Sequence, residues 1–221
     1  MYINIISDDM LSELLKGNIE KKTITQIYGP PGVGKTNIAI ISGTNFIKKG
    51  FKVVYIDTEG GLSYERIKQI SGSDTDRVLK NLIIYEPESF EDQLKVLEKL
   101  FNIDNLGLVI IDGITSLYRL ELSDDVYENT RLNRLLGKQI LTLLNLAKKK
   151  NVAILITNQV SDTPNGFKAV GGRLLEYWSK IIIRMEKINR KREIILEKHR
   201  HIEEGLKIKF EIVNEGIKII Y

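Results

Sequence analysis

The chain has 221 residues, a length typical of one large α/β domain, because single domains usually take about 100–200 residues. No apolar stretch approaches the roughly 20 residues that a membrane helix needs, and Asp8 and Asp9 interrupt the apolar N-terminus where a secretory signal would continue. The absence of cysteine excludes disulfides, Cys-based zinc sites and thiol catalysis. A net charge of +4 permits nucleic-acid binding without establishing it, and we expect a cytoplasmic protein that does not contact membranes.

Strands and helices are predicted to alternate through the first two-thirds of the chain. Continuous apolar runs are typical of buried strands, and apolar residues at helical spacing are typical of helices. The predicted strands are 24–28, 51–57, 82–85, 108–112 and 152–157, and the predicted helices between them are 35–48, 64–70, 89–101 and 126–150. This alternation predicts an α/β fold with a mostly parallel, twisted sheet flanked by helices on both faces.

Beyond residue 179 the pattern changes to short strands, several of which alternate apolar and charged residues. These predicted strands are 181–185, 193–197, 207–213 and 217–221, with a tight turn at Asn214-Glu-Gly216 between the last two. We therefore expect an antiparallel meander added to the sheet, with one face exposed to water. Because no repeat, linker or low-complexity tract divides the chain, residues 1–221 are predicted to form a single domain.

A glycine-rich segment lies between the first predicted strand and the helix that follows it. It matches the pattern G-x-x-x-x-G-K-T, and a strand before and a helix after it are the context that a P-loop requires. Glycines allow successive backbone N–H groups to point at phosphate oxygens, and the helix adds the positive end of its dipole. Lys35 is expected to reach the β- and γ-phosphates of ATP, and Thr36 to bind Mg²⁺. The residues predicted to bind the nucleotide are Gly29, Pro30, Pro31, Gly32, Val33, Gly34, Lys35, Thr36 and Asn37.

Polar side chains at other predicted strand ends are expected to complete the ATP site, because ligands of open α/β sheets bind at these ends. Asp112 ends an apolar strand and is expected to hold Mg²⁺ through water. Glu59 closes the strand after the P-loop helix and is predicted to activate the attacking water, with Asp57 as the other candidate. Gln159 is predicted to bond the γ-phosphate. The alternatives are a solvated loop position for Glu59 and Gln159, and a helix cap for Glu59.

Several segments, in this order, resemble the ATPase core of the RecA/RadA recombinases, and the resemblance covers nearly the whole chain. They are Tyr55-Ile-Asp-Thr-Glu-Gly60 with Glu65-Arg-Ile67, Ile111-Asp-Gly-Ile-Thr-Ser-Leu-Tyr-Arg119, Ile156-Thr-Asn-Gln-Val160 and Val170-Gly-Gly172. The resemblance implies ATP and Mg²⁺ as cofactors, ATP bound between neighbouring copies, and two DNA-binding loops at about 121–134 and 160–172. It also implies that Arg66 stacks near the adenine, with an ordinary surface arginine as the alternative.

Two differences from the longer recombinases indicate which branch of the family the chain resembles. Only residues 1–28 precede the P-loop, so the N-terminal helical DNA-binding domain is expected to be absent, and the P-loop carries Pro30 and Pro31. This pattern resembles the RadB branch, archaeal paralogues associated with weak ATP turnover, DNA binding and modulation of a RadA-type recombinase or a junction resolvase. The implied function is a weak DNA-associated ATPase in DNA repair and homologous recombination, able to bind single-stranded or junction DNA and to form homo-oligomers.

Basic residues near the C-terminus are the candidate DNA contacts. Lys198, His199 and Arg200 resemble a basic motif of the RadB branch that contacts DNA. The cations predicted to widen the same positive patch are Arg190, Lys191 and Arg192. A solvated strand end is the alternative for these side chains. The alternative functions are a KaiC-like regulatory ATPase and an ATP-gated protein-binding module without a role on DNA.

Overall fold

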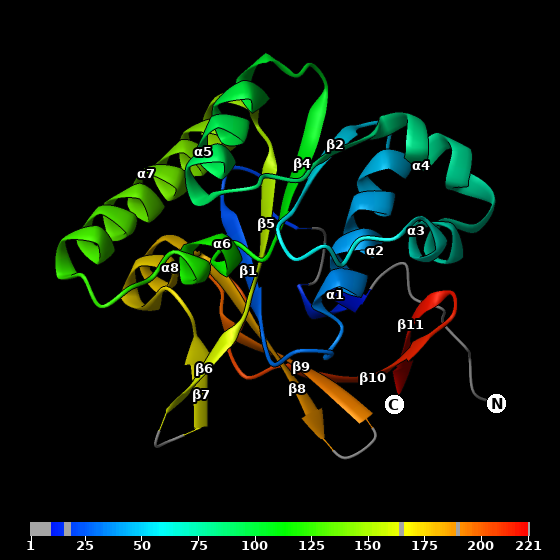
Figure 1. Ribbon diagram of the computed structural model, residues 1–221. Helices are drawn as coiled ribbons and strands as arrows, with labels where there is room; N and C mark the ends of the chain where they lie inside the picture. The colour runs from blue at the N-terminus through cyan, green and yellow to red at the C-terminus, as the bar shows by residue number, and fades with distance from the viewer. Residues whose placement is uncertain (1–9, 16–18, 164–165, 189–190, 221) are drawn as a thin grey trace.

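A nine-stranded sheet runs through the molecule, with helices against both of its faces (Figure 1). The computed structural model describes residues 10–15, 19–163, 166–188 and 191–220. The strand order of the large sheet is β11-β10-β9-β8-β1-β5-β4-β2-β3. A separate two-stranded antiparallel sheet is formed by β6 (Val160–Thr163) and β7 (Gly166–Ala169), directly after β5.

Six strands are parallel and include the one that leads into the P-loop. They are β1 (Ile24–Tyr28), β2 (Lys52–Asp57), β3 (Leu82–Tyr85), β4 (Leu106–Asp112), β5 (Ala153–Asn158) and β8 (Ile181–Ile188). The central strands are apolar because helices cover both faces, and every residue of β4 is buried. The C-terminal ends of these strands lie along one edge of the sheet, where Asp57 of β2 is in register with Asp112 of β4.

The C-terminal part of the sheet is the antiparallel meander that the sequence predicts. β9 (Lys191–Lys198), β10 (Lys207–Val213) and β11 (Gly216–Ile220) follow β8 as consecutive antiparallel neighbours. The predicted turn joins β10 to β11, and the parallel pairing of β8 with β1 attaches the meander to the rest of the sheet. This arrangement places β8, β9 and β10 beside the P-loop.

The helices form two groups, one on each face of the sheet (Figure 1). One face carries α1 (Met10–Leu14), α2 (Lys35–Lys48), α3 (Tyr64–Ser71) and α4 (Thr75–Asn81), and the other carries α5 (Phe90–Lys99), α6 (Ser116–Leu120), α7 (Val126–Lys150) and α8 (Gly172–Trp178). Two 3₁₀ turns, η1 (Gly72–Asp74) and η2 (Leu100–Asn102), follow α3 and α5. Each face has its own apolar core, and the adjacent strand residues Leu155 and Ile156 belong to opposite cores.

The predicted α/β fold is confirmed, and the bounds of β1, α2, β3 and α7 are the predicted ones. The sequence did not predict α1, α4, α6, α8 or the β6–β7 hairpin. Each of these elements has seven residues or fewer, and none is a continuous apolar run like that of β3, so neither a helical period nor a buried-strand pattern identifies them. In the part of the chain that the structure describes, no helix is long and apolar enough to cross a membrane.

The first expected DNA loop, at 121–134, is mostly helix. α7 begins at Val126, and the side chain of Asp125 accepts hydrogen bonds from the backbone N–H groups of Tyr127 and Glu128. This N-cap satisfies two donors that a helix start leaves unpaired, so the helix extends nearly to α6. Only residues 121–125 connect the two helices, and the expected loop is therefore corrected to that short segment.

Candidate nucleotide-binding site

The P-loop connects β1 to α2 at the C-terminal edge of the parallel strands. Gly32 has φ 70° and Gly34 has φ 109°, backbone conformations that L-residues with a side chain rarely adopt. These two glycines allow the chain to turn into α2, whose first backbone N–H groups face the loop. The segment therefore has the strand, loop and helix start that a phosphate-binding loop needs.

Lys35 is the cation of this loop, and its side chain lies in the interior of the site. The residue is 6% exposed, and Nζ donates hydrogen bonds to Gly29 O at 2.9 Å and Pro30 O at 3.2 Å. Burial lowers the pKa of Lys35, while the nearby carboxylates of Glu59 and Asp112 act in the opposite direction. The ammonium group is thus held over the loop between carbonyl oxygens and acids.

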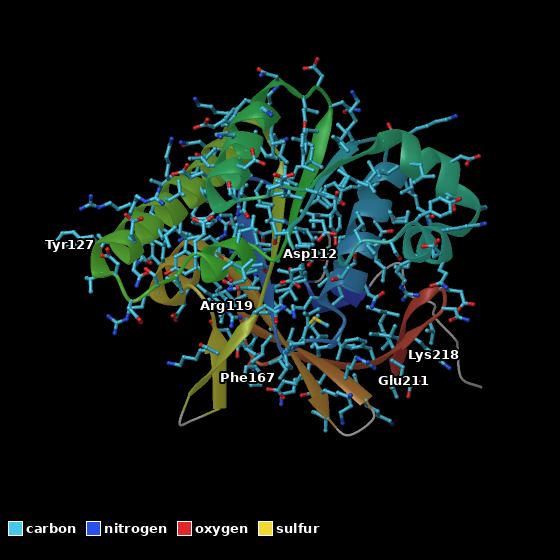
Figure 2. The ribbon with its side chains drawn as sticks, in the orientation of Figure 1. Asp112, Arg119, Tyr127, Phe167, Glu211 and Lys218 are labelled. Carbon is cyan, nitrogen blue, oxygen red and sulfur yellow. The ribbon has the colours of Figure 1, made fainter. Side chains whose placement is uncertain are left out.

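Asp112 ends β4 beside the P-loop, and Figure 2 shows it in the middle of the molecule. Its carboxylate accepts hydrogen bonds from three hydroxyl groups, those of Thr36 at 2.8 Å, Tyr55 at 2.7 Å and Thr157 at 2.5 Å. Burial raises the pKa of Asp112, and the three hydrogen bonds partly offset this rise. The hydroxyl oxygen of Thr36 and the carboxylate of Asp112 are hard oxygen donors side by side, a set that suits Mg²⁺.

Two partners of Asp112 were not predicted from the sequence. Tyr55 is 1% exposed inside β2, and Thr157 is fully buried near the end of β5, on either side of β4. Burial and the charge of Asp112 raise the pKa of Tyr55 well above its usual value, so it stays a hydrogen-bond donor. Polar residues inside otherwise apolar strands were the available signal, but the strand order needed to pair them with Asp112 is not visible in the sequence.

Glu59 and Gln159 are brought together from the ends of β2 and β5. Gln159 Nε2 donates to both carboxylate oxygens of Glu59 at 3.1 Å, and Ser116 Oγ donates to Glu59 Oε1 at 2.8 Å. Gly113, with φ 92°, makes this approach feasible, because a Cβ there would lie 2.7 Å from Glu59 Cγ and 2.5 Å from Ser116 Oγ. The sequence predicted Glu59 and Gln159 separately, and the structure places them in one hydrogen-bonded cluster.

Asp57, the other candidate for the catalytic carboxylate, has a structural role. It is 3% exposed, and its carboxylate accepts hydrogen bonds from the backbone N–H groups of four successive residues. These donors are Glu59, Gly60, Gly61 and Leu62, at 3.0, 2.9, 3.3 and 2.9 Å. Because its oxygens hold the loop after β2 in place, Asp57 positions Glu59 and is itself occupied.

Arg66 links α3 to the P-loop helix and to the C-terminal turn. Its Nε donates to Asn37 Oδ1 at 2.5 Å, and its two terminal nitrogens bond Gln69 Oε1 and the backbone oxygens of 213, 214 and 216. Asn37, which lies on α2 and was predicted to bind the nucleotide, therefore contacts Arg66 of α3. The N–H groups of the guanidinium thus donate to oxygens of the protein itself. Stacking of the guanidinium face on adenine stays a prediction.

The basic residues predicted as one DNA patch lie at opposite ends of β9. Seven residue steps of a strand span about 23 Å, so Lys191 and Lys198 are far apart. Arg192 lies beside the P-loop, where Nη2 donates to Gly32 O at 3.5 Å, and Lys198 Nζ donates to Glu176 O at 2.7 Å. Arg190 lies outside the described residues. The fold therefore does not join Lys191 and Arg192 with Lys198 into one continuous patch.

His199 and Arg200 are both bonded to other parts of the protein. The side chain of His199 is 3% exposed, and its Nδ1 accepts hydrogen bonds from the backbone N–H groups of His201 and Ile202. Burial lowers the pKa of His199, which favours this neutral acceptor. Arg200 remains exposed and pairs with Glu20 at 2.7 Å. His199 accordingly stabilises a turn, and its role as a DNA contact stays a prediction.

The second expected DNA loop contains the β6–β7 hairpin and the start of α8. Phe167 of this hairpin packs edge-to-face on Tyr28, with ring centroids 6.5 Å apart, and Figure 2 labels it on the yellow hairpin. An open cavity of about 980 Å³ lies between this hairpin, α8 and the sheet. Lys168, Arg173 and Lys198 all line it, together with acids such as Glu176. The fold thus brings Lys198 to the second loop, which the sequence alone did not predict.

Comparisons with known proteins place the chain in a family. A family model described as Rad51 matches residues 2–219. DNA repair and recombination protein RadB of Methanococcus maripaludis strain C7 is 64% identical over 211 residues, covering 96% of this chain and 98% of the relative. The protein of the same name from Methanocaldococcus jannaschii is 58% identical over 213 residues, covering 96% of this chain and 100% of the relative.

A solved structure agrees with the sequence relatives. The crystal structure of the RadB recombinase matches with a TM-score of 0.81 at 35% identity, covering 96% of this chain and 98% of that one. These matches agree with the resemblance to the recombinases and not with the KaiC-like alternative. The chain therefore belongs to the Rad51 family of RecA-fold ATPases, and within it to the archaeal RadB branch.

Proposed function

We propose that this chain is a single-domain DNA repair and recombination protein that binds ATP with Mg²⁺, hydrolyses it slowly and binds DNA. The observation that carries the proposal is the convergence of Lys35, Thr36, Asp112, Glu59 and Gln159 at one edge of the sheet, from four separate elements and their ends. Membership in a family of RecA-fold ATPases supports nucleotide binding. The names of the relatives support a role in DNA repair and recombination.

The binding step uses the P-loop backbone, Lys35 and the metal ligands. The loop N–H groups and the start of α2 bind phosphate oxygens, and Lys35 moves from the carbonyl oxygens it now bonds to the β- and γ-phosphates. Thr36 and Asp112 would hold Mg²⁺, whose charge would offset the negative charge of the phosphates.

The hydrolysis step uses Glu59 to orient the attacking water and accept its proton. Ser116 and Gln159 fix the direction of the carboxylate, because both donate to it. A carboxylate has about four acceptor positions, so a position remains for the attacking water beside these two donors. Gln159 also starts the segment that leads into the hairpin, so its contact with Glu59 links the γ-phosphate position to the second loop.

DNA binding is proposed for the second loop and its surroundings. Lys168 and Arg173 are exposed there, and Lys198 lines the same cavity, whose lining also contains four glutamates. Two of these glutamates pair with Arg184. Phosphate contacts of this kind require positive charge. The first loop is a poorer candidate, since residues 121–125, which connect α6 to α7, contain three acids and no lysine or arginine. The negative charges of these acids repel the phosphate backbone of DNA.

A second candidate function is an ATP-gated protein-binding module. The segment around the first loop exposes apolar side chains, with Leu120 81%, Val126 75% and Tyr127 88% exposed. Figure 2 shows Tyr127 at the outer end of α7. Exposed aliphatic and aromatic side chains near acids suit a protein partner better than DNA. The proposed partners are a RadA-type recombinase, a junction resolvase or a second copy of the chain.

The test is binding to labelled single- and double-stranded DNA across a salt series, with ADP, with a non-hydrolysable ATP analogue and without nucleotide. We expect log affinity to fall linearly with log salt, and Lys168→Ala with Arg173→Ala to reduce the slope by about 1–2 units. The matched control removes two charges from the end of α7 with Lys148→Ala and Lys149→Ala. No DNA binding at low salt, with intact nucleotide binding, would leave the protein-binding module as the function.

A further inference from the structure

The outer side of the P-loop rests on three consecutive strands of the C-terminal meander. At β8, a Cβ added to Gly29 would lie 2.4 Å from Met185 O, and at β10 a Cβ on Gly34 would lie 2.9 Å from Ile212 Cδ1. Between them, at β9, Arg192 Nη2 donates to Gly32 O at 3.5 Å. The loop is thus supported by close backbone and apolar contacts on both sides of one charged side chain.

Arg192 is the polar member of this support, and its environment is unusual. Its Nε is buried and has no hydrogen-bond partner among the described residues. Its cross-strand neighbour on β8 is another cation, Lys187. A buried donor without a partner and two like charges directly opposite each other both destabilise a sheet. Such a pair is tolerated where hydrogen-bond acceptors lie next to it, and Arg192 contacts the carbonyl oxygen of Gly32.

The contact acts on the peptide bond between Gly32 and Val33. In a trans peptide the C=O and the N–H point in opposite directions. A cation that holds the carbonyl of Gly32 from the outer side therefore turns the N–H of Val33 toward the inner side, where the phosphates bind. Gly32 has φ 70° and no side chain to hold its end of this peptide, whereas Val33 at the other end is fully buried in the apolar core.

We propose that Arg192 is a positioning residue of the P-loop, which holds the Gly32–Val33 peptide in its phosphate-binding orientation. The inference rests on the proposed ATP binding, and it removes Arg192 from the DNA-binding surface. The N–H of Val33 would serve ADP and ATP alike, since both carry the phosphates that lie against the loop. Arg192 therefore tunes affinity for both nucleotides and does not take part in the hydrolysis step.

The experiment compares ADP and ATP affinity by calorimetry, with KM and kcat for hydrolysis, in three variants of the full chain. Arg192→Met keeps the apolar stem that lies opposite Phe210 on β10 but removes every donor. We expect it to weaken both nucleotides about tenfold, to raise KM and to leave kcat unchanged, the scale of one charge-assisted hydrogen bond. Arg192→Lys restores most of the affinity, because it returns the charge.

The matched control is Lys191→Ala, which removes the same charge from the preceding residue of β9. Lys191 is exposed and points to the opposite face, so nucleotide affinity should stay at the wild-type value. Thermal unfolding without nucleotide checks that all variants are folded. If Arg192→Met is not, Arg192→Gln, which also removes the charge, replaces it in the comparison with Arg192→Lys.

Three results separate the possible failures. Wild-type protein that binds neither nucleotide contradicts the proposed function itself. Wild-type binding with an unchanged Arg192→Met affinity overturns the positioning role. A loss confined to ATP, with ADP affinity intact, also overturns it, because it would mean a direct contact with the γ-phosphate.

Discussion

Replacing Tyr55 by phenylalanine removes one of the three hydroxyl groups that hold the buried carboxylate of Asp112. The ring is 1% exposed and its hydroxyl donates to Asp112 Oδ2 at 2.7 Å, so the variant loses a hydrogen bond while the ring still fills its space. A hydrogen bond to a charged group contributes about 1.5–3 kcal/mol, and we expect the free energy of unfolding at pH 7 to fall by that amount. For a chain of this length, the melting temperature should fall by roughly 3–12 °C.

The loss should depend on pH, because burial raises the pKa of Asp112. A raised pKa in the folded state means that wild-type stability decreases as the pH rises through that value, where Asp112 becomes charged. The tyrosine hydroxyl opposes this decrease by bonding the charged form. As the pH falls and Asp112 becomes neutral, the same hydrogen bond contributes only about 0.5–1.5 kcal/mol. The difference between wild type and Tyr55→Phe should therefore shrink at lower pH.

The assay is urea denaturation over a pH series, in a chelating buffer that keeps metal ions from the site. Tyr118→Phe is the matched control, since Tyr118 is 8% exposed and its hydroxyl bonds the neutral Asn133 Oδ1 at 3.0 Å. We expect the control to lose about 1 kcal/mol without pH dependence. Equal losses in the two variants at every pH, or a Tyr55→Phe loss within about 0.5 kcal/mol, would refute the assigned role of this hydroxyl.

Three further variants test the site and the DNA surface. Lys35→Ala should weaken ATP by roughly 100-fold in calorimetry, because it removes the cation of the loop, and retained affinity would contradict the nucleotide assignment. Glu59→Gln keeps size and hydrogen bonding but removes the base, so phosphate release should slow by about 100-fold with ATP still bound, and undiminished turnover would move the role to another group. Lys198→Ala with Arg200→Ala should reduce the salt slope of DNA affinity by about 1–2 units with ATP affinity unchanged. An unchanged slope would make these residues an ordinary solvated strand end.

The sequence by itself determined the order and kind of the main elements. Apolar runs that end in Asp57 and Asp112 predict buried parallel strands, and those residues do close β2 and β4. The P-loop is recognisable because its glycines, lysine and threonine must lie at fixed, short spacings in the sequence to surround phosphates. The motif therefore identified the part of the nucleotide site whose residues are close in sequence. The ends of the predicted strands indicated which acids complete the site.

Tertiary structure decided which of these groups meet. Asp57 and Glu59 are two residues apart, and the sequence favours Glu59 as the base with Asp57 as the other candidate. The loop conformation uses Asp57 to bind four N–H groups and directs Glu59 to Gln159. Likewise, Arg192 and Lys198 look like parts of one patch, but β9 carries them to opposite ends. Strand order and register depend on pairings between distant segments, and these pairings are set by how whole apolar faces fit together. No local pattern contains that information, so the neighbours of Asp112 and the place of Arg192 beside the P-loop follow from the fold alone.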